Sequence, residues 1–132
     1  MNNKFLMDNR CFACGSDNPI GLHLDIQENV DGVYAKIKLN PVFQGYSQVI
    51  HGGIVSTILD EMAVWAAFKK GKKAVTAELN VRIKKPMLSD TEYVAMGKVI
   101  NIKYNLVIAQ AEIKDANEQT IACADVKLIQ IE

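Results

Sequence analysis

The stretch that decides the fold lies at residues 51–71, which read HGGIVSTILDEMAVWAAFKKG. Its apolar residues recur with helical spacing and predict one long helix over residues 53–70. The two glycines at its start let a bound group approach the backbone, because neither carries a Cβ atom. The free N–H groups at a helix start favour an oxyanion, and a carboxylate, Asp60, follows within the same helix. Backbone donors and a carboxylate are the parts needed for attack on a carbonyl carbon.

Outside this helix the hydrophobic period changes to two, which predicts strands. The expected strands cover residues 22–27, 33–39, 75–83, 92–102, 106–114 and 119–131. Gly97 is expected to mark a bulge or bend. Short turns between the strands predict a mainly antiparallel sheet, and the single helix must cover one of its faces. We therefore expect an α+β fold, in one domain over residues 1–132 that begins with an irregular segment at 1–21.

The predicted helix has a broad apolar arc and a second face of small residues. Ser56, Ala63 and Ala67 share the second face with Asp60, where they leave room beside its carboxylate. Glu61 falls at the border of the apolar arc, which indicates a paired acid rather than a site residue. A phase error of one residue would exchange the two acids. The scarcity of charge on the second face predicts that the helix is covered on most sides.

Composition excludes several classes of function. Fifteen basic and fifteen acidic residues give a net charge of zero, which argues against a nucleic-acid partner and permits self-association. Residues 1–8 lack the apolar core of a signal peptide. The apolar run at 62–68 is much shorter than the roughly 20 residues that span a bilayer. We expect a cytoplasmic protein without a membrane partner, whose sheet edges pair in a homodimer.

Three cysteines, Cys11, Cys14 and Cys123, are too few and of the wrong parity for a disulfide framework in a cytosolic chain. The Cys11-x-x-Cys14-Gly15 turn has the shape of a metal knuckle. Structural zinc usually takes four protein ligands, commonly two such pairs. The sequence offers no second pair, only Cys123 and His23 as loose candidates, so no metal site is predicted.

The helix geometry constrains the site further. Asp60 lies seven residues after Gly53, which corresponds to about 10 Å along the helix axis. One small carbonyl group cannot contact both on the same chain, so we expect the acid of one subunit to face the helix start of another. His51 is interpreted as a hydrogen-bonding anchor for the turn, with direct catalysis as the alternative. Gly52 and Gly53 either permit a tight turn or form an anion site, and their position before a helix favours the anion site.

These residues carry a resemblance to a known family. The motif His51-Gly52-Gly53-(x)6-Asp60 resembles that of the hotdog-fold acyl-CoA thioesterases, in the phenylacetate-pathway-like branch of the 4-hydroxybenzoyl-CoA thioesterase superfamily. The opening Cys11-Phe12-x-Cys14-Gly15-x-x-Asn18-Pro19-x-Gly21-Leu22 is similar to a segment that precedes this domain in many members. The resemblance covers residues 11–132.

The resemblance implies a hotdog fold, in which an antiparallel sheet of five to six strands wraps around the long helix and two chains join edge to edge. It implies that the thioester carbonyl binds at the Gly53 helix start of one subunit, while Asp60 of the other activates water or attacks directly. Thr76 matches an assisting hydroxyl residue. The polar residue that precedes the histidine in some members falls here on Gly45, so the assisting role of the adjacent Gln44 stays open. The candidate substrate-binding residues are His51, Gly52, Gln44 and Glu61.

The expected activity is hydrolysis of an acyl-CoA to free acid and CoA, without a metal or cofactor, in a homodimer or homotetramer. A non-catalytic acyl-CoA-binding or sensing domain on the same fold is the main alternative. A hotdog dehydratase requires a catalytic histidine in a different motif, which the chain lacks. A metal-binding interaction protein built on the cysteines is the third alternative. The sequence does not specify the acyl group.

Overall fold

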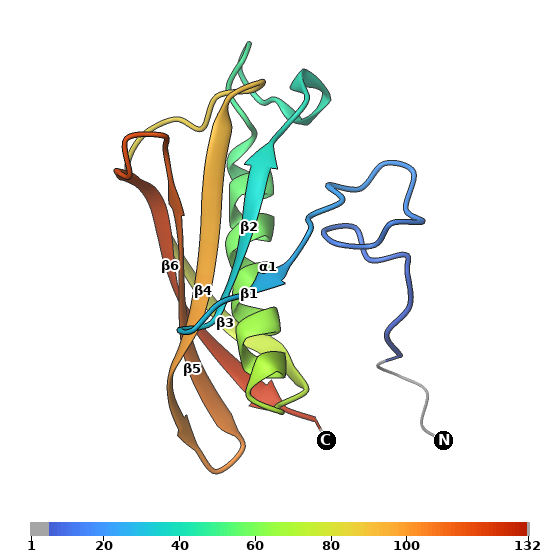
Figure 1. The fold of residues 1–132 in the computed structure, drawn as a ribbon, viewed down its shortest axis with the longest axis vertical. Coiled ribbons are helices and arrows are strands. Elements are labelled where there is room, and N and C mark those ends of the chain that lie inside the picture. The colour runs from blue at the N-terminus through green and yellow to red at the C-terminus, as the bar shows by residue number, and fades with distance from the viewer. Residues whose placement is uncertain (1–5, 132) are drawn as a thin grey trace.

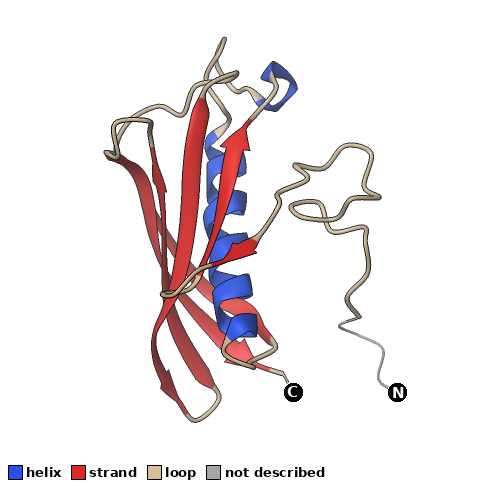
Figure 2. Cartoon of the chain, viewed as in Figure 1, coloured by secondary structure: helices blue, strands red, loops and turns tan. Residues whose placement is uncertain are grey.

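A computed structural model describes residues 6–131 and shows one antiparallel sheet wrapped around one long helix (Figure 1; Figure 2). The elements are β1 (Gln27–Glu28), β2 (Val33–Lys38), the short 3-10 helix η1 (Pro41–Phe43), α1 (Gly52–Lys69), β3 (Ala74–Ile83), β4 (Glu92–Lys103), β5 (Leu106–Lys114) and β6 (Thr120–Gln130). The six strands lie in the order β1-β2-β4-β5-β6-β3. The predicted fold class is confirmed. Residues 1–5 of the predicted N-terminal segment lie outside the described residues.

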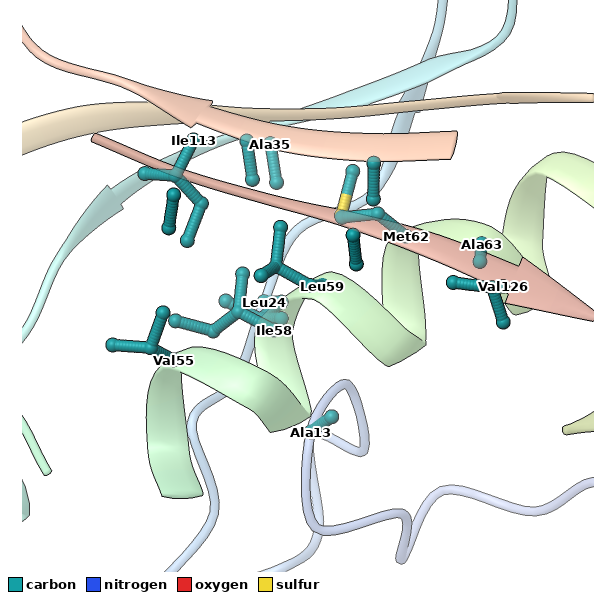
Figure 3. Close-up of a cluster of buried hydrophobic side chains, with 14 of the residues drawn as sticks. Ala13, Leu24, Ala35, Val55, Ile58, Leu59, Met62, Ala63, Ile113 and Val126 are labelled. Carbon is teal, nitrogen blue, oxygen red and sulfur yellow. The ribbon is translucent and has the colours of Figure 1, made fainter. Parts of the chain in front are cut away.

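Helix α1 buries one face against the sheet (Figure 3). The buried residues are Val55, Ile58, Leu59, Met62, Ala63, Ala66 and Ala67. Ala63 and Ala67 are fully buried, which agrees with the prediction that the helix is covered on most sides but not with the expectation that these two residues leave room beside Asp60. The apolar arc predicted for the helix included Phe68. The buried face of α1 is rotated away from this residue, which is 42% exposed. Within residues 6–131, no helix has the length and hydropathy to cross a membrane.

Gly97 allows the helix and the sheet to approach each other closely. A Cβ atom at Gly97 would overlap the backbone oxygen of Met62 on α1. Gly97 was expected to mark a bulge or bend, and the bulge is wrong, because Gly97 pairs in regular register with Ala111 and the register between β4 and β5 shifts between Val99 and Asn101 instead. The sequence signal was a glycine within a strand, and here the glycine serves helix packing rather than strand irregularity.

The predicted strand at residues 22–27 is mostly absent, since β1 contains only its last residue and the next one. Leu22 and Leu24 are buried, as their alternation predicted. Their N–H groups donate to the carbonyl oxygens of Phe12 (2.8 Å) and Ala13 (2.9 Å) rather than to the sheet. The stretch therefore pairs with the N-terminal segment, which lies on the side of α1 away from β4, β5 and β6 (Figure 1).

Strand β3 forms one edge of the sheet. It pairs with β6 on one side, and no described strand pairs with its other side. Residues 77–80 are all exposed, with Leu79 at 36%, and Ile83 is 46% exposed. The strand predicted at residues 75–83 is confirmed, but its apolar residues are not buried in alternation along most of its length. An uncovered strand edge with exposed apolar side chains is suited to pairing with another chain.

Candidate functional site

The start of α1 is fixed by the histidine that precedes it. His51 is the N-cap residue, and its Nδ1 atom accepts a hydrogen bond of 2.9 Å from the Gly53 N–H. The His51 N–H donates to the carbonyl oxygen of Phe43 at 2.9 Å, which ties the helix start to the preceding loop. The hydrogen bond from the Gly53 N–H to His51 Nδ1 satisfies one of the free N–H groups of the first turn. His51 therefore anchors the turn.

The two glycines at the helix start differ in what their N–H groups meet. The Gly53 N–H is engaged by His51, whereas the Gly52 N–H meets no acceptor among residues 6–131. Gly52 is exposed, and a Cβ atom there would lie 3.5 Å from the Ile83 side chain at the end of β3. A free helical N–H beside an open surface can donate to an oxyanion.

Gln44 lies in the loop that leads to the helix start. Its side-chain oxygen accepts a hydrogen bond of 3.0 Å from the Gln48 N–H, and its backbone bridges to Ile50. The neighbouring Gly45 packs against His51, since a Cβ atom there would lie 3.4 Å from the His51 Cα. The structure thus places Gln44 next to the turn of His51 and the glycines.

Asp60 and Thr76 are brought together from different elements. The Thr76 hydroxyl on β3 donates a hydrogen bond of 2.5 Å to Asp60 Oδ1 on α1, and both residues are half-buried. Thr76 precedes an irregularity in the ladder between β3 and β6, where the register shifts between Thr76 and Glu78. A half-exposed carboxylate held by a hydroxyl group at a strand edge can accept a proton from a bound molecule.

Glu61, the next residue, points to other partners. Its Oε2 atom accepts a hydrogen bond of 2.9 Å from the Trp65 indole N–H, and Cys11 Sγ lies 3.6 Å from the same oxygen. Burial, followed by the hydrogen bond and negative charge of Glu61, raises the pKa of the Cys14 thiol well above its usual value. Cys14 therefore stays protonated at neutral pH in this environment and is not a nucleophilic thiolate.

Sequence reasoning missed the contact between Glu61 and the two cysteines. It named Cys123 and His23 as further candidate ligands, but His23 instead lies 2.5 Å from the Asn18 carbonyl oxygen. Cys11 and Glu61 are 50 residues apart in the chain, so no local pattern joins them. The position of Glu61 at the border of the helical apolar arc was the one available signal.

A cavity of about 930 Å³ lies between the N-terminal segment and α1. Its walls include Cys11, Cys14 and Glu61, and also Trp65. Val75 lines it as well and directly precedes Thr76 in β3. The cavity is thus one residue away from the pair of Asp60 and Thr76.

Within one chain the glycine turn and the acid remain apart. Both belong to the continuous helix α1, and the seven residues from Gly53 to Asp60 correspond to about 10 Å along its axis. The predicted site residues therefore lie at two separate places on α1. The backbone donors are at its start, and the carboxylate with its hydroxyl partner is about 10 Å further along.

Comparison with known proteins identifies the family. The family model described as "Thioesterase superfamily" matches residues 47–122, more than half of the chain, and this region contains the glycine turn, Asp60 and Thr76. Comparison with functionally curated proteins finds no match.

The fold is similar to that of several solved structures. The crystal structure of a thioesterase superfamily protein has a TM-score of 0.88 and 20% identity, over 92% of this chain and 61% of that one. This chain therefore spans less than two thirds of that protein's length. The PaaI protein from the phenylacetic acid degradation operon of E. coli has a TM-score of 0.77 and 20% identity, over 84% of this chain and 81% of that one.

A protein from Streptococcus mutans, solved bound to acetyl CoA, has a TM-score of 0.76 and 16% identity, over 82% of this chain and 88% of that one. These likenesses establish the hotdog fold that the resemblance implied. With the match over residues 47–122, they show that the chain belongs to the thioesterase superfamily.

Proposed function

We propose that the protein is an acyl-CoA thioesterase, which hydrolyses an acyl-CoA to the free acid and CoA. The observation that carries this proposal is the hydrogen bond between Thr76 and Asp60, which holds a carboxylate at the unpaired edge of the sheet. Membership of the thioesterase superfamily supports it. A CoA thioester as substrate is supported by the similar Streptococcus mutans protein, which was solved with acetyl CoA. A cytoplasmic location, expected from the sequence, suits this substrate.

The site is proposed to form between two copies of the chain. Thr76 near one end of β3 contacts Asp60, and Ile83 at the other end lies beside Gly52. Antiparallel pairing of β3 with a second copy of itself, centred on Leu79, would bring the Thr76 end of one strand beside the Ile83 end of the other. The Asp60 carboxylate of one subunit would then approach the helix start of the other. A homodimer is the smallest assembly that completes the site, and a homotetramer would contain two such dimers.

In the proposed reaction, the thioester carbonyl oxygen accepts a hydrogen bond from the Gly52 N–H of one subunit. The Gly53 N–H supplies a second hydrogen bond when it exchanges His51 Nδ1 for the substrate oxygen. Donors of this kind stabilise the oxyanion of the tetrahedral intermediate by a few kcal/mol. Gln44, beside the same turn, is proposed to position the carbonyl group or the attacking water.

The Asp60 carboxylate of the other subunit takes a proton from water as the water oxygen bonds to the carbonyl carbon. Collapse of the intermediate breaks the C–S bond, and the proton passes from Asp60 to the departing CoA sulfur. Thr76 orients Asp60 through its hydrogen bond. Glu61 contacts Trp65 and Cys11 instead, so we assign it no part in the hydrolytic step.

Two measurements test this proposal. Thiol release over a panel of acyl-CoA esters should show turnover for the wild-type protein and strong loss for Asp60→Asn. Tight binding of CoA esters by the wild-type protein without any turnover would instead support the non-catalytic binding domain.

The shared site is tested by mixing subunits. Asp60→Ala and Gly53→Val should each be inactive alone, and co-refolding them in equal amounts should restore about a quarter of wild-type activity. Half of the dimers are then hybrids, and each hybrid has one intact site of two. Mixtures that stay inactive, although hybrid dimers are present by mass spectrometry, would overturn the shared site.

A further inference from the structure

Three side chains that the proposed hydrolysis does not use converge on another side of α1. The Cys11 and Cys14 thiols and the Glu61 carboxylate each place one ligand atom within 4.8 Å of the others. Cys11 Sγ and Glu61 Oε2 are 3.6 Å apart. A tetrahedral Zn²⁺ ion with Zn–S of about 2.3 Å and Zn–O of about 2.0 Å holds its sulfur and oxygen ligands about 3.5 Å apart. The spacing of these two ligands therefore suits zinc.

The turn that carries the two cysteines is held by the rest of the chain. The Gly15 N–H donates to the Cys11 carbonyl oxygen at 2.8 Å, and a side chain at Gly15 would collide with the backbone of Cys11 and Asn9. Between the cysteines, Ala13 is only 3% exposed and packs against α1 as part of the core (Figure 3). The backbone thus fixes both thiols next to the helix. Side chains held in this way need little reorganisation to bind an ion.

The charge of the cluster favours a cation. The half-buried Glu61 carboxylate has the Trp65 indole and the Cys11 sulfur as its partners, and neither an arginine nor a lysine is paired with it among residues 6–131. Removing a carboxylate from water is costly unless a positive charge or strong hydrogen bonds compensate, and thiols are weak donors. A divalent cation would pair directly with Glu61 and would release the protons of the two thiols that it binds, so the cluster keeps one net negative charge.

We propose that Cys11, Cys14 and Glu61 bind one Zn²⁺ ion, which fastens the N-terminal segment to α1. Two thiolates and one carboxylate supply three ligands, and the two thiol protons pass to water as the Zn–S bonds form. The fourth position faces the cavity of about 930 Å³ and holds water. Thiolate ligands select zinc over magnesium and calcium, which prefer oxygen. Trp65 is a positioning residue, because its indole N–H orients the Glu61 carboxylate.

The site is tested on the full chain, reduced and stripped of metal. Titration with Co²⁺, which replaces zinc and is coloured, should give a thiolate-to-metal absorption band that saturates at one ion per chain. Added Zn²⁺ should displace the Co²⁺ and abolish the band. Trp65 is the only tryptophan in the sequence, so its fluorescence should change with the same stoichiometry. Elemental analysis of untreated protein should find about one zinc ion per chain.

Single substitutions test whether the metal binds at Cys11, Cys14 and Glu61 rather than at another cysteine or carboxylate. Cys11→Ser, Cys14→Ser and Glu61→Gln should each weaken Co²⁺ binding by more than about 100-fold, and Trp65→Phe by about 10–100-fold. Cys123→Ser is the matched cysteine control, and Asp60→Asn is the matched carboxylate control; both should bind as the wild-type protein does. Glu61→Gln keeps both thiols, and circular dichroism will show that it is folded.

Two results would overturn the proposal. One is the absence of a saturable thiolate band in folded protein whose three thiols are shown to be reduced. The other is a band that Glu61→Gln leaves unchanged or that Cys123→Ser removes. Because Asp60→Asn is expected to lose turnover but keep the metal, failure of the zinc site is distinguishable from failure of the proposed hydrolysis.

Discussion

Asp60 and Glu61 are adjacent carboxylates in the middle of one helix, and they meet entirely different surroundings. Asp60 contacts a hydroxyl group on the edge strand β3, where another chain can pair. Glu61 contacts an indole and a thiol beneath the irregular N-terminal segment. One step along a helix rotates the side chain by about 100°, so adjacent residues face different parts of the fold.

The difference teaches that the surroundings of an acid, rather than its place in a motif, decide what it can do. A carboxylate beside an unpaired edge is accessible to a substrate and to a partner subunit. A carboxylate beside two thiols is suited to a soft cation. The following experiments test this division of roles.

The largest effect is expected for Asp60→Asn. Loss of the carboxylate should lower kcat for acyl-CoA hydrolysis by about 10²–10⁴-fold, because a positioned base contributes that much. Glu61→Gln should lower kcat far less. Steady-state thiol release with both variants makes the comparison, and a larger loss in Glu61→Gln would reverse the assignment of the two acids.

A smaller effect is expected for Leu79→Asp at the proposed dimer edge. Two negative charges would face each other near the symmetry axis and should weaken the dimer on the order of 100-fold. Specific activity should then fall on dilution, as followed by analytical ultracentrifugation and thiol release in parallel. Binding of Co²⁺ on the Glu61 side should persist.

The control for this charge is Val30→Asp. Val30 is 97% exposed in the turn between β1 and β2, far along the sheet order from β3. The Val30→Asp substitution adds the same charge at an exposed apolar position, and it should leave the dimer intact. Equal weakening by both substitutions would contradict pairing through β3.

Thr76→Val should reduce kcat about tenfold, since a hydrogen bond to a charged group contributes about 1.5 kcal/mol or more. Valine keeps the shape of threonine but removes the donor to Asp60. Thr76→Ser retains the hydroxyl group and should recover most of the activity. Equal losses in both variants would mean that the threonine methyl group, not its hydrogen bond, matters at this edge.

The smallest effect is expected for Trp65→Phe on the other side of the helix. It leaves a half-buried carboxylate oxygen without its indole donor, so the free energy of unfolding should fall by about 1–2 kcal/mol. Urea unfolding followed by circular dichroism measures this change. Phe68→Leu disturbs the edge-to-face contact with Trp65, whose ring centroids lie 5.5 Å apart, but removes no hydrogen bond. A similar loss in Phe68→Leu would attribute the effect to ring packing.

Much of the fold followed from periodicity. The helix at 53–70 was confirmed within one residue at each end, and β5 matched its predicted bounds. These segments have strong local patterns and clear terminal signals. The strand at 22–27 was wrong because its alternation correctly indicated a buried face but not the partner of its backbone. Hydrophobic periodicity specifies which side chains of a strand are buried, whereas the strand that its backbone pairs with depends on residues far away in the sequence.

For the candidate site, spacing predicted Asp60 and the resemblance implied Thr76. The structure places these two residues in contact, and their role in catalysis stays a prediction. The helical periodicity placed Ala63 and Ala67 outside the apolar arc, yet both are buried, because a helix enclosed by a sheet buries alanines as readily as large residues. The cluster of Cys11 with Glu61 depended on how the N-terminal segment folds back, which no short-range pattern records.

The close contact between Gly97 and the Met62 carbonyl has a mechanical consequence. A helix lodged against a glycine on the sheet cannot slide or roll without raising other side chains over that point. The packing therefore holds the helix in one position on the sheet, and we expect Asp60 and Glu61 to keep a constant distance from the sheet. Under the proposed function, we expect any movement that admits a substrate to come from the loop before His51 or from the N-terminal segment, and hydrogen exchange can test this expectation.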